Sequence, residues 1–283
     1  MEYNWKVEWA ILAPPAEATK ILAISGYPCN TGSQGTTARV RNTTVISFLI
    51  RKLEQRDILS DEEKQALEGA LARVKEFRAD EDMVREGDRP SESILLLEGF
   101  AARYKLLSNG KRQITAIHVP GDFIDLHSFL QKKMDHSIVA LTPCRGGLFP
   151  HENLRTITDN HLHLGRLLWL NTLIDSAIHR EWLVAMGRRP ALNQIAHLLC
   201  ELFLRLQTVG LTQDLSFQLP VTQAELGDVL GLSTVHVNRV LQELRASGAL
   251  VWRGDTLTIE DWPRLQEIAE FDPTYLILER EPR

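Results

Sequence analysis

The chain has 283 residues, of which 44% are hydrophobic and 24% are charged, and its formal net charge at pH 7 is −5. These values are typical of a globular protein with a sizeable core, and the length favours two domains over one. They argue against a membrane-spanning chain, because no run reaches the roughly 18 apolar residues of a transmembrane helix. Pro14, Pro15 and Glu17 interrupt the apolar stretch at the start, so we expect no signal peptide and a cytoplasmic protein.

The acidic balance offers no general basic surface for nucleic acid, so any DNA affinity would depend on a few local arginines. Between residues 188 and 255 the arginines and the acidic residues cancel. The cysteines are Cys29, Cys144 and Cys200, too few for a four-thiolate iron–sulfur cluster within one chain. We therefore expect reduced thiols and no such cluster.

Residues 1–42 are expected to be a disordered extension, because the stretch 29–41 is rich in Asn, Thr, Gly, Ser and Gln and has almost no apolar side chains. A short helix is predicted over residues 60–78. Ser60 and Glu63 form a capping box at its start. Its apolar stripe consists of Leu67, Leu71 and Val74.

Strand periodicity marks the segment that ends near residue 150. The runs 101–107 and 112–119 flank Asn109-Gly110, and Asn-Gly between such runs is the strongest short signal for a β-hairpin. Short strands at this spacing are typical of a small antiparallel barrel or jelly roll. We therefore expect an antiparallel β-roll in this part of the chain.

Residues 151–188 are helical in pattern and strongly apolar on one side. This stripe fits either a helix in the core of its own chain or the seam of a homodimer. We favour the seam, because the motif described next is usually used in two copies. The stripe consists of Leu164, Leu167, Leu168, Asn171, Ile174 and Ile178. Arg189-Pro190 ends the run, and a further helix is predicted over 191–207.

Residues 222–245 spell a helix-turn-helix. Thr222 and Glu225 form a capping box that starts the first helix. Gly231 lies where the chain must turn sharply, and glycine adopts the left-handed backbone that such a turn needs. Ser233 then caps the second helix. The combination favours DNA binding over a chance helical hairpin.

The second helix has an apolar face and a polar face. The apolar face, with i, i+3, i+4, i+7 spacing, consists of Val237, Val240, Leu241 and Leu244. We expect Gly227 of the first helix to face Val237, so that the two helices approach closely. On the polar face Arg239 suits guanine, Asn238 suits adenine, and Val235 suits a thymine methyl group. The residues expected to contact DNA are Thr222, Gln223, Ser233, Thr234, Val235, His236, Asn238, Arg239 and Gln242.

Two short β-prone runs flank Gly254 and predict a β-hairpin, the wing of a winged helix. Asp261 and Pro263 then start a terminal helix as its cap and first-turn residue. The fold class expected for the chain is α+β, with an N-terminal antiparallel β-roll, a long helix and a C-terminal winged helix-turn-helix.

This order of parts resembles the Crp/Fnr family of bacterial transcription regulators. Besides the helix-turn-helix, Glu86-Gly87-Asp88, Gly99 and Pro120-Gly121-Asp122-Phe123 match the glycine pattern of that family's β-roll. The resemblance covers about residues 43–283.

The resemblance implies a sensor domain over 43–150, a dimerisation helix over 151–188 and a winged helix-turn-helix domain over 189–283. It also implies a homodimer that binds a palindromic promoter site in double-stranded DNA, with RNA polymerase as a partner. In this family a signal in the β-roll shifts the dimer helices and sets the spacing of the recognition helices.

The resemblance places an effector pocket at Asp125, Leu126, His127, His136 and Ser137. Family members that bind cyclic AMP use a Gly-Glu-Leu segment and an Arg-Ser pair there. Leu126 cannot bond a ribose hydroxyl, and His136, mostly neutral at pH 7, poorly replaces arginine beside a cyclic phosphate. Cyclic AMP is therefore disfavoured, and the family's oxygen-sensing cysteine cluster is missing from the sequence.

Several histidines gather in one stretch: His118, His127, His136, His151, His161 and His163. A metal, haem or pH sensor is one interpretation, but scattered histidines are favoured because the spacing matches no ligand motif, and we expect no metal site. A cupin-type metal-dependent enzyme would need a His-x-His on barrel strands, whereas His161 and His163 fall on the long helix. A cyclic-nucleotide-binding module with another output is the third alternative. We expect a regulator rather than an enzyme, with no cofactor identified.

Overall fold

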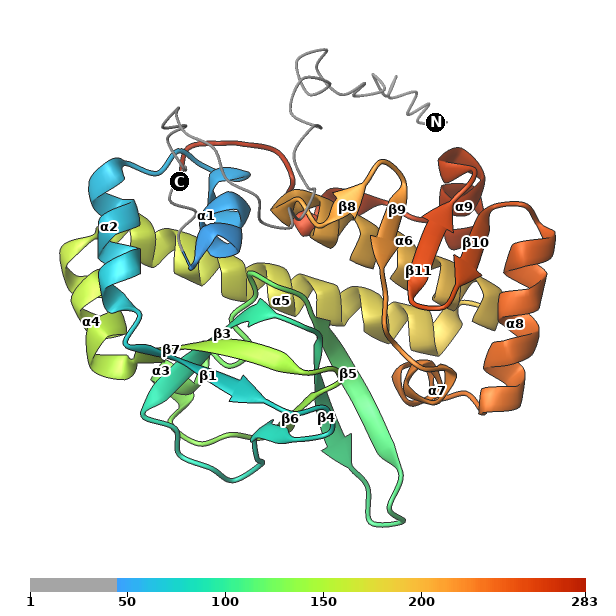
Figure 1. Cartoon of the computed structure of the whole chain (residues 1–283), viewed down its shortest axis with the longest axis horizontal. Helices are drawn as coiled ribbons and strands as arrows, with labels where there is room; N and C mark the ends of the chain where they lie inside the picture. Colours follow the sequence, from blue (N-terminus) through green and yellow to red (C-terminus); the bar gives the residue numbers. More distant parts are fainter. Residues whose placement is uncertain (1–44) are drawn as a thin grey trace, which may run out of the picture. The chain divides into compact units, whose positions relative to one another are not determined.

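A computed structural model describes residues 45–283, and the element labels used below are those of Figure 1. The expected disordered extension over residues 1–42 lies outside the described residues. Within 45–283, no helix combines the length and the apolar composition needed to cross a membrane. The described part begins with two helices, α1 (Ser47–Glu54) and α2 (Asp61–Ala70).

The predicted antiparallel β-roll is confirmed as two sheets that lie together below α1 and α2 in Figure 1. One sheet has the strand order β1-β7-β3 and the other β2-β6-β4-β5, and all pairs are antiparallel. Asn109-Gly110 turns the chain between β4 and β5 as predicted, with Gly110 at a φ of 78°. The strands and the short helix α3 are β1 (Arg73–Phe77), β2 (Asp82–Val84), β3 (Glu92–Glu98), β4 (Ala101–Leu106), β5 (Arg112–His118), α3 (Ser128–Gln131), β6 (Ser137–Ala140) and β7 (Cys144–Pro150).

The helix predicted over residues 60–78 is shorter than expected. Its capping box is confirmed, because Ser60 Oγ accepts the Glu63 N–H and the Glu63 carboxylate accepts the Ser60 N–H. However, α2 ends at Ala70 and the chain enters β1, so Val74 lies on a strand. The prediction was wrong here because β1 is held by pairing with β7, a long-range contact that overrides local periodicity.

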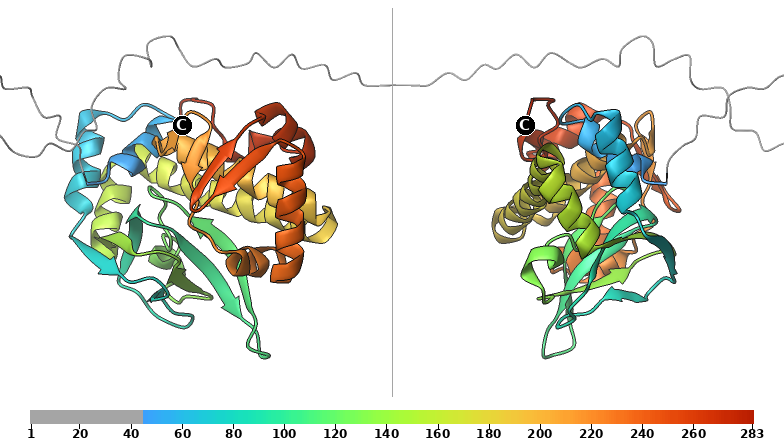
Figure 2. Two further views of the ribbon diagram at one scale, coloured as in Figure 1. Left: turned by 45° about the vertical axis from the view of Figure 1, so that its right-hand side comes forward. Right: turned by 90° about the vertical axis from the view of Figure 1, so that its left-hand side faces the viewer.

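Two helices rather than one follow the β-roll. Helix α4 (His151–Asn160) ends before His161, whose φ of −124° and ψ of 78° are not helical, and α5 (Leu162–Arg188) begins next. The segment 151–188, expected as a single helix, is therefore broken near its start. After Pro190, α6 (Ala191–Val209) follows as predicted, and the left view in Figure 2 shows α5 running beside the β-roll.

The apolar stripe that we expected to form the homodimer seam is buried inside its own chain. Its members are 0–9% exposed: Leu164, Leu167, Leu168, Asn171, Ile174 and Ile178. The first three pack in a cluster with apolar residues of α1, α2 and α4, and Ile174 and Ile178 join a second cluster shared with β5 and α6. The structure therefore supports the core interpretation of this stripe, and the predicted seam residues are corrected. Periodicity identified the buried face of α5 but could not tell what covers it.

The C-terminal part has the predicted winged helix-turn-helix. The hairpin β10–β11 is the wing, and β8 and β9, which we did not predict, extend it to a sheet with the order β10-β11-β9-β8. Asp261 caps the terminal helix as expected, accepting the Arg264 N–H. The elements are β8 (Thr212–Gln213), β9 (Ser216–Gln218), α7 (Gln223–Leu230), α8 (Thr234–Ala246), β10 (Leu250–Arg253), β11 (Thr256–Ile259), α9 (Trp262–Ala269) and the 3₁₀ helix η2 (Pro273–Leu276).

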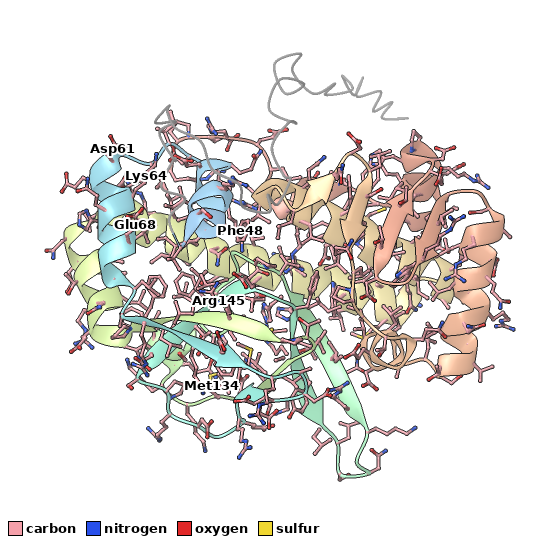
Figure 3. The ribbon with its side chains drawn as sticks, in the orientation of Figure 1. Phe48, Asp61, Lys64, Glu68, Met134 and Arg145 are labelled. Carbon is pink, nitrogen blue, oxygen red and sulfur yellow. The ribbon has the colours of Figure 1, made fainter. Side chains whose placement is uncertain are left out.

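A close backbone approach joins α1 to the β-roll. Gly121 has a φ of 93°, and a Cβ built on it would lie 3.1 Å from the carbonyl of Phe48, which Figure 3 labels on α1. A side chain at this position would be strained by the positive φ and would press tightly against the helix backbone. The same turn carries Asp122, whose ion pairs are described below.

Candidate DNA-binding surface and sensor region

The boundaries of the helix-turn-helix are set by local hydrogen bonds, as predicted. Thr222 Oγ1 accepts the Glu225 N–H at 3.2 Å, while the Glu225 carboxylate accepts the Thr222 N–H at 2.6 Å. Gly231 ends α7 in the left-handed conformation at a φ of 66°, and Ser233 Oγ accepts the His236 N–H at the start of α8. These caps fix where α8 begins and therefore which of its residues face outward.

Gly227 allows the close packing that we predicted, but its neighbour is different. A Cβ built on Gly227 would lie 2.6 Å from the carbonyl oxygen of Leu232, in the turn between α7 and α8. The nearest atoms belong to the backbone of Leu232 and Thr234 rather than to Val237. The glycine is thus required by the turn backbone, and the predicted contact with Val237 is corrected.

Helix α8 turns the expected residues toward the core and toward solvent. Its apolar face, Val237, Val240, Leu241 and Leu244, is at most 3% exposed. Val235 is 82% exposed, an unusual value for a large apolar side chain, and Arg239 and Gln242 are also exposed. The exposed face of α8 is therefore the one that sequence analysis assigned to base contacts.

A chain of side-chain hydrogen bonds links α7 to α8 on this face. Gln242 Nε2 donates to Asn238 Oδ1 at 3.0 Å, and Asn238 Nδ2 donates to Gln223 Oε1 at 3.1 Å. These bonds use one N–H and one lone pair of the Asn238 amide, so they restrain the side chain while leaving one donor and one lone pair for a base. Within residues 45–283, Arg239 makes one such bond, from Nη2 to Nε2 of His236 at 3.1 Å, so most of its donors remain available.

The predicted effector residues lie in several different surroundings. Asp125 is fully buried and accepts the Ile94 N–H at 2.6 Å, and burial raises the pKa of its carboxyl to about 7. Leu126 packs against the apolar cluster that contains α1 and α2. Ser137 Oγ accepts the Glu86 N–H. His127 and His136 do lie together, with ring centroids 4.9 Å apart.

The other histidines of the stretch are dispersed among the described residues. His151 lies near the hydroxyls of Ser93 and Ser128, and His163 bridges the carboxylates of Asp57 and Glu63. His118 is fully buried, and burial together with the charge of Arg103 lowers its pKa to about 3. The interpretation as scattered histidines thus fits these three but not the His127–His136 pair.

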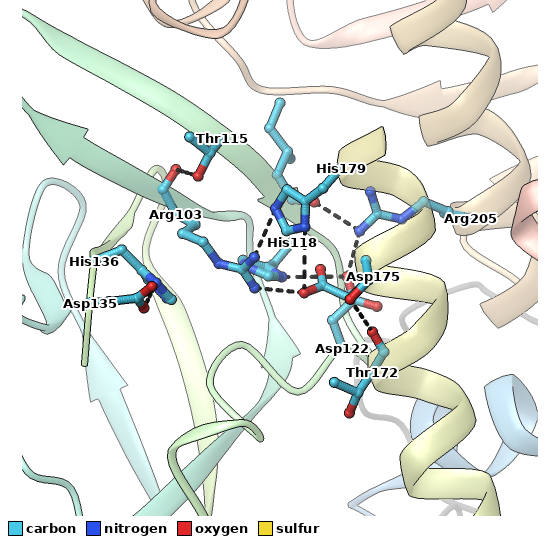
Figure 4. Close-up of polar contacts among 12 residues, drawn as sticks. Arg103, Thr115, His118, Asp122, Asp135, His136, Thr172, Asp175, His179 and Arg205 are labelled. Atoms are coloured by element: carbon cyan, nitrogen blue, oxygen red, sulfur yellow. Dashed lines mark hydrogen bonds and ion pairs between the residues drawn. The ribbon is translucent and has the colours of Figure 1, made fainter. Parts of the chain in front are cut away.

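A partly buried ion pair that we did not predict connects the β-roll to α5. Arg103 on β4 donates to Asp175 Oδ2 at 2.9 Å and to His179 Nε2 at 2.8 Å, and both partners lie on α5 (Figure 4). Burial opposes ionisation of Asp175, but the guanidinium of Arg103 outweighs it and lowers the pKa to about 2. The i, i+4 spacing of Asp175 and His179 is the only sequence signal for this contact.

A second ion cluster joins the β-roll to α1 and α6. Asp122 accepts from Arg205 Nη2 at 2.7 Å (Figure 4) and from Lys52 Nζ at 2.6 Å, and Arg205 also donates to Glu201 at 3.0 Å. Burial alone would raise the pKa of Asp122, but the charges of Lys52 and Arg205 outweigh it and hold the pKa below its usual value. The carboxylate therefore stays ionised. The sequence identified Asp122 only as a turn residue.

The β4–β5 hairpin also contacts the helix-turn-helix directly. Arg112 Nε donates to Asp228 Oδ2 at 2.9 Å, and Gln113 Nε2 donates to the carbonyls of Asp228 and Val229 at 2.9 and 3.0 Å. All of these acceptors lie on α7. The β-roll therefore contacts α7, the helix that packs against α8, in addition to its contacts with α5.

The chain matches two known domain families. Residues 74–161 match the cyclic nucleotide-binding domain, and residues 193–268 match the Crp-like helix-turn-helix domain. Transcriptional activator protein FnrL of Cereibacter sphaeroides is 25% identical over 216 residues, which are 75% of this chain and 86% of that protein. Nitrogen fixation regulation protein FixK of Bradyrhizobium diazoefficiens is 28% identical over 200 residues, 70% of this chain and 83% of that protein.

A solved structure gives the same picture. FixK2 from Bradyrhizobium japonicum is 26% identical, superposes with a TM-score of 0.64, and covers 70% of this chain and 97% of its own. These relatives regulate transcription or nitrogen fixation by name and none is an enzyme, so the cupin-type alternative is set aside. The fold, the helix-turn-helix and these matches agree, and the chain belongs to the Crp/Fnr family of DNA-binding transcription regulators.

Proposed function

We propose that two copies of the chain bind one palindromic promoter site in double-stranded DNA, each inserting α8 into the major groove. The observation that carries this proposal is the exposed face of α8, whose start is fixed by the Ser233 cap. On this face Val235 is exposed to solvent, and Arg239, one turn further along, keeps most of its hydrogen-bond donors available. Two identical recognition helices read two half-sites that are related by the same two-fold symmetry.

Within each half-site, we assign base reading to Arg239 and Val235. The forked donors of arginine match O6 and N7 of guanine, and an exposed valine packs on a thymine methyl group. Ser233 and Thr234, at the start of α8, and Thr222, at the start of α7, are exposed near helix N-termini, which favour phosphate oxygens. We assign secondary contacts to His236 and to the amides of Gln223, Asn238 and Gln242, since hydrogen bonds within the chain already use part of their capacity.

For the homodimer seam, we propose the solvent-facing side of α5 in place of the buried stripe. This side exposes large apolar side chains: Leu162 68%, Trp169 67%, Leu173 48% and Leu183 69%. Leu162, Trp169 and Leu183 are spaced by multiples of seven residues, as in the seam of a coiled coil. A second copy of α5 is the occupant that this spacing fits, because two-fold pairing would place equivalent side chains opposite one another.

Cyclic AMP does not fit the residues of the β-roll, although the matched domain family is named for cyclic nucleotides. Burial and then Arg103 lower the pKa of His136 to about 4, so the ring is neutral, and its Nδ1 is bonded to Asp135. Leu126 packs against an apolar cluster and has no polar group for a ribose. Arg103 is already paired with Asp175. We therefore propose that the signal is not cyclic AMP and that no iron–sulfur cluster is involved.

RNA polymerase is the further partner that we propose, with action in the cytoplasm, where a bacterial promoter is found. The named relatives are bacterial regulators, and one of them is called a transcriptional activator. An exposed surface beside a bound promoter would be placed next to the polymerase.

Replacement of Arg239 tests the assignment. We expect Arg239→Ala to lose about 1–3 kcal/mol of binding free energy on the specific duplex and to relax the preference at one base pair per half-site. Arg245→Ala is the matched control, because Arg245 is also exposed on α8 but lies at its end and bonds the carbonyl of Trp252. Equal losses on specific and random duplexes would show that Arg239 touches only phosphate.

A further inference from the structure

Two imidazole rings from separate segments meet at the edge of the β-roll. His127 directly precedes α3 and His136 directly precedes β6, and their ring centroids are 4.9 Å apart. The carboxylate of Asp135 lies beside them, so that one potential ligand atom of each residue is within 4.8 Å of the other two. Nothing in the proposed DNA-binding function uses these side chains.

The hydrogen bonds of the pair leave one nitrogen of each ring without a partner. His136 Nδ1 and Asp135 Oδ1 are 2.7 Å apart, which assigns the proton to Nδ1 and leaves the lone pair on Nε2. Nε2 of His136 and Nε2 of His127 are both buried, and neither has a hydrogen-bond partner among residues 45–283. A buried polar atom without a partner needs an explanation, and a bound ion is one of the few available.

The loop that carries His136 and Asp135 is fixed by contacts independent of the pair. Met134, labelled in Figure 3, is 1% exposed; its N–H donates to the Asp88 carbonyl and its carbonyl accepts the Gly87 N–H. Lys105 Nζ donates to the carbonyl of Asp135 at 2.6 Å. The donor atoms are therefore held near one another before any ion arrives.

We propose that His127 and His136 bind one divalent transition-metal ion of the zinc, cobalt or nickel type through their unpartnered Nε2 atoms. Imidazole nitrogens are ligands that these ions favour, and the other positions are left for water. The Asp135 carboxylate is not a ligand but orients the His136 ring through Nδ1, the usual arrangement around a metal-bound histidine.

The charges around the site permit such an ion. The two neighbouring cations are each offset by a carboxylate, since Arg103 pairs with Asp175 at 2.9 Å and Lys105 pairs with Glu86 at 2.6 Å. An ion here would lie beside the residue that ties the β-roll to α5 (Figure 4).

Cobalt titration of the full-length, chelator-treated protein tests the site. We expect one saturable Co²⁺ per chain, with visible absorption bands of nitrogen and oxygen ligation, no thiolate charge-transfer band, and displacement by Zn²⁺. His127→Ala and His136→Ala should each weaken binding at least tenfold, and Asp135→Asn by about 10- to 100-fold. His161→Gln is the matched control and should bind as the wild type does.

Two results would overturn the proposal. One is the absence of saturable Co²⁺ or Zn²⁺ binding by the wild-type protein, and the other is equal affinity in wild type and Asp135→Asn. The Asp135 side chain is 67% exposed, so this variant keeps the test decisive even if a buried histidine variant fails to fold. Because the titration contains no DNA, its outcome is independent of the proposed regulatory function.

Discussion

Truncation of one leucine on each face of α5 separates the two interpretations of this helix. Leu183 is 69% exposed in the single chain, whereas Leu167 is 1% exposed. Full burial of a leucine side chain is worth about 1.5–3 kcal/mol, so covering the exposed part of Leu183 would contribute about 1–2 kcal/mol per protomer. Two copies contribute about 2–4 kcal/mol, so Leu183→Ala should raise the dimer dissociation constant by about 30- to 1000-fold.

The matched variant should behave in the opposite way. Leu167→Ala removes core packing and should lower the free energy of unfolding by about 2–5 kcal/mol, while the remaining folded protein dimerises as the wild type does. Sedimentation equilibrium over a concentration series gives the dissociation constants, and urea unfolding at fixed concentration gives the stabilities. Two results together would show that the buried stripe forms the dimer seam after all. They are an unchanged dimer dissociation constant in Leu183→Ala, and a raised dissociation constant with an unchanged free energy of unfolding in Leu167→Ala.

Three further predictions concern stability. Burial lowers the pKa of His163, but its bonds to two carboxylates raise it more, so the folded pKa lies above the unfolded value of about 6.5. The stabilisation from His163 is then complete below about pH 6.5 and is lost as pH rises through the folded pKa, so the gap in unfolding free energy between wild type and His163→Gln should shrink as pH rises above about 6.5, and a widening gap would contradict this. Gly227→Ala places a methyl group 2.6 Å from the Leu232 carbonyl oxygen and should cost about 1–3 kcal/mol, so an unchanged melting temperature would refute the packing described for the turn. Asp122→Asn removes the buried charge that pairs with Arg205 and should cost about 3–5 kcal/mol in urea unfolding; a loss below about 1 kcal/mol would show that the cluster contributes little.

The helix-turn-helix was predictable because its signals are local. Thr222, Gly231 and Ser233 set caps and a turn through hydrogen bonds that span three residues, and the spacing of Val237 and Leu244 fixes the buried face of α8. Each of these effects acts within one or two helical turns, so the sequence pattern determines it without knowledge of the rest of the fold.

Features that depend on distant contacts were missed or misassigned. The helix expected beyond Ala70 is replaced by β1, which requires β7 as a partner. The stripe on α5 was correctly recognised as apolar, but only the fold tells which element covers it. The ion pair of Arg103 with Asp175 and the meeting of His127 with His136 join residues from separate segments, and no spacing motif marks them.

Selection of bound duplexes from a random DNA pool tests the central claim most directly, namely that paired α8 helices read a specific site. We expect the full-length protein, with and without Zn²⁺, to enrich a palindrome whose half-site centres are about one helical turn apart, on the order of 10 base pairs. Arg239→Ala should enrich the same palindrome with one base pair per half-site no longer specified. Recovery of no preferred sequence by the wild-type protein under any condition would contradict the claim.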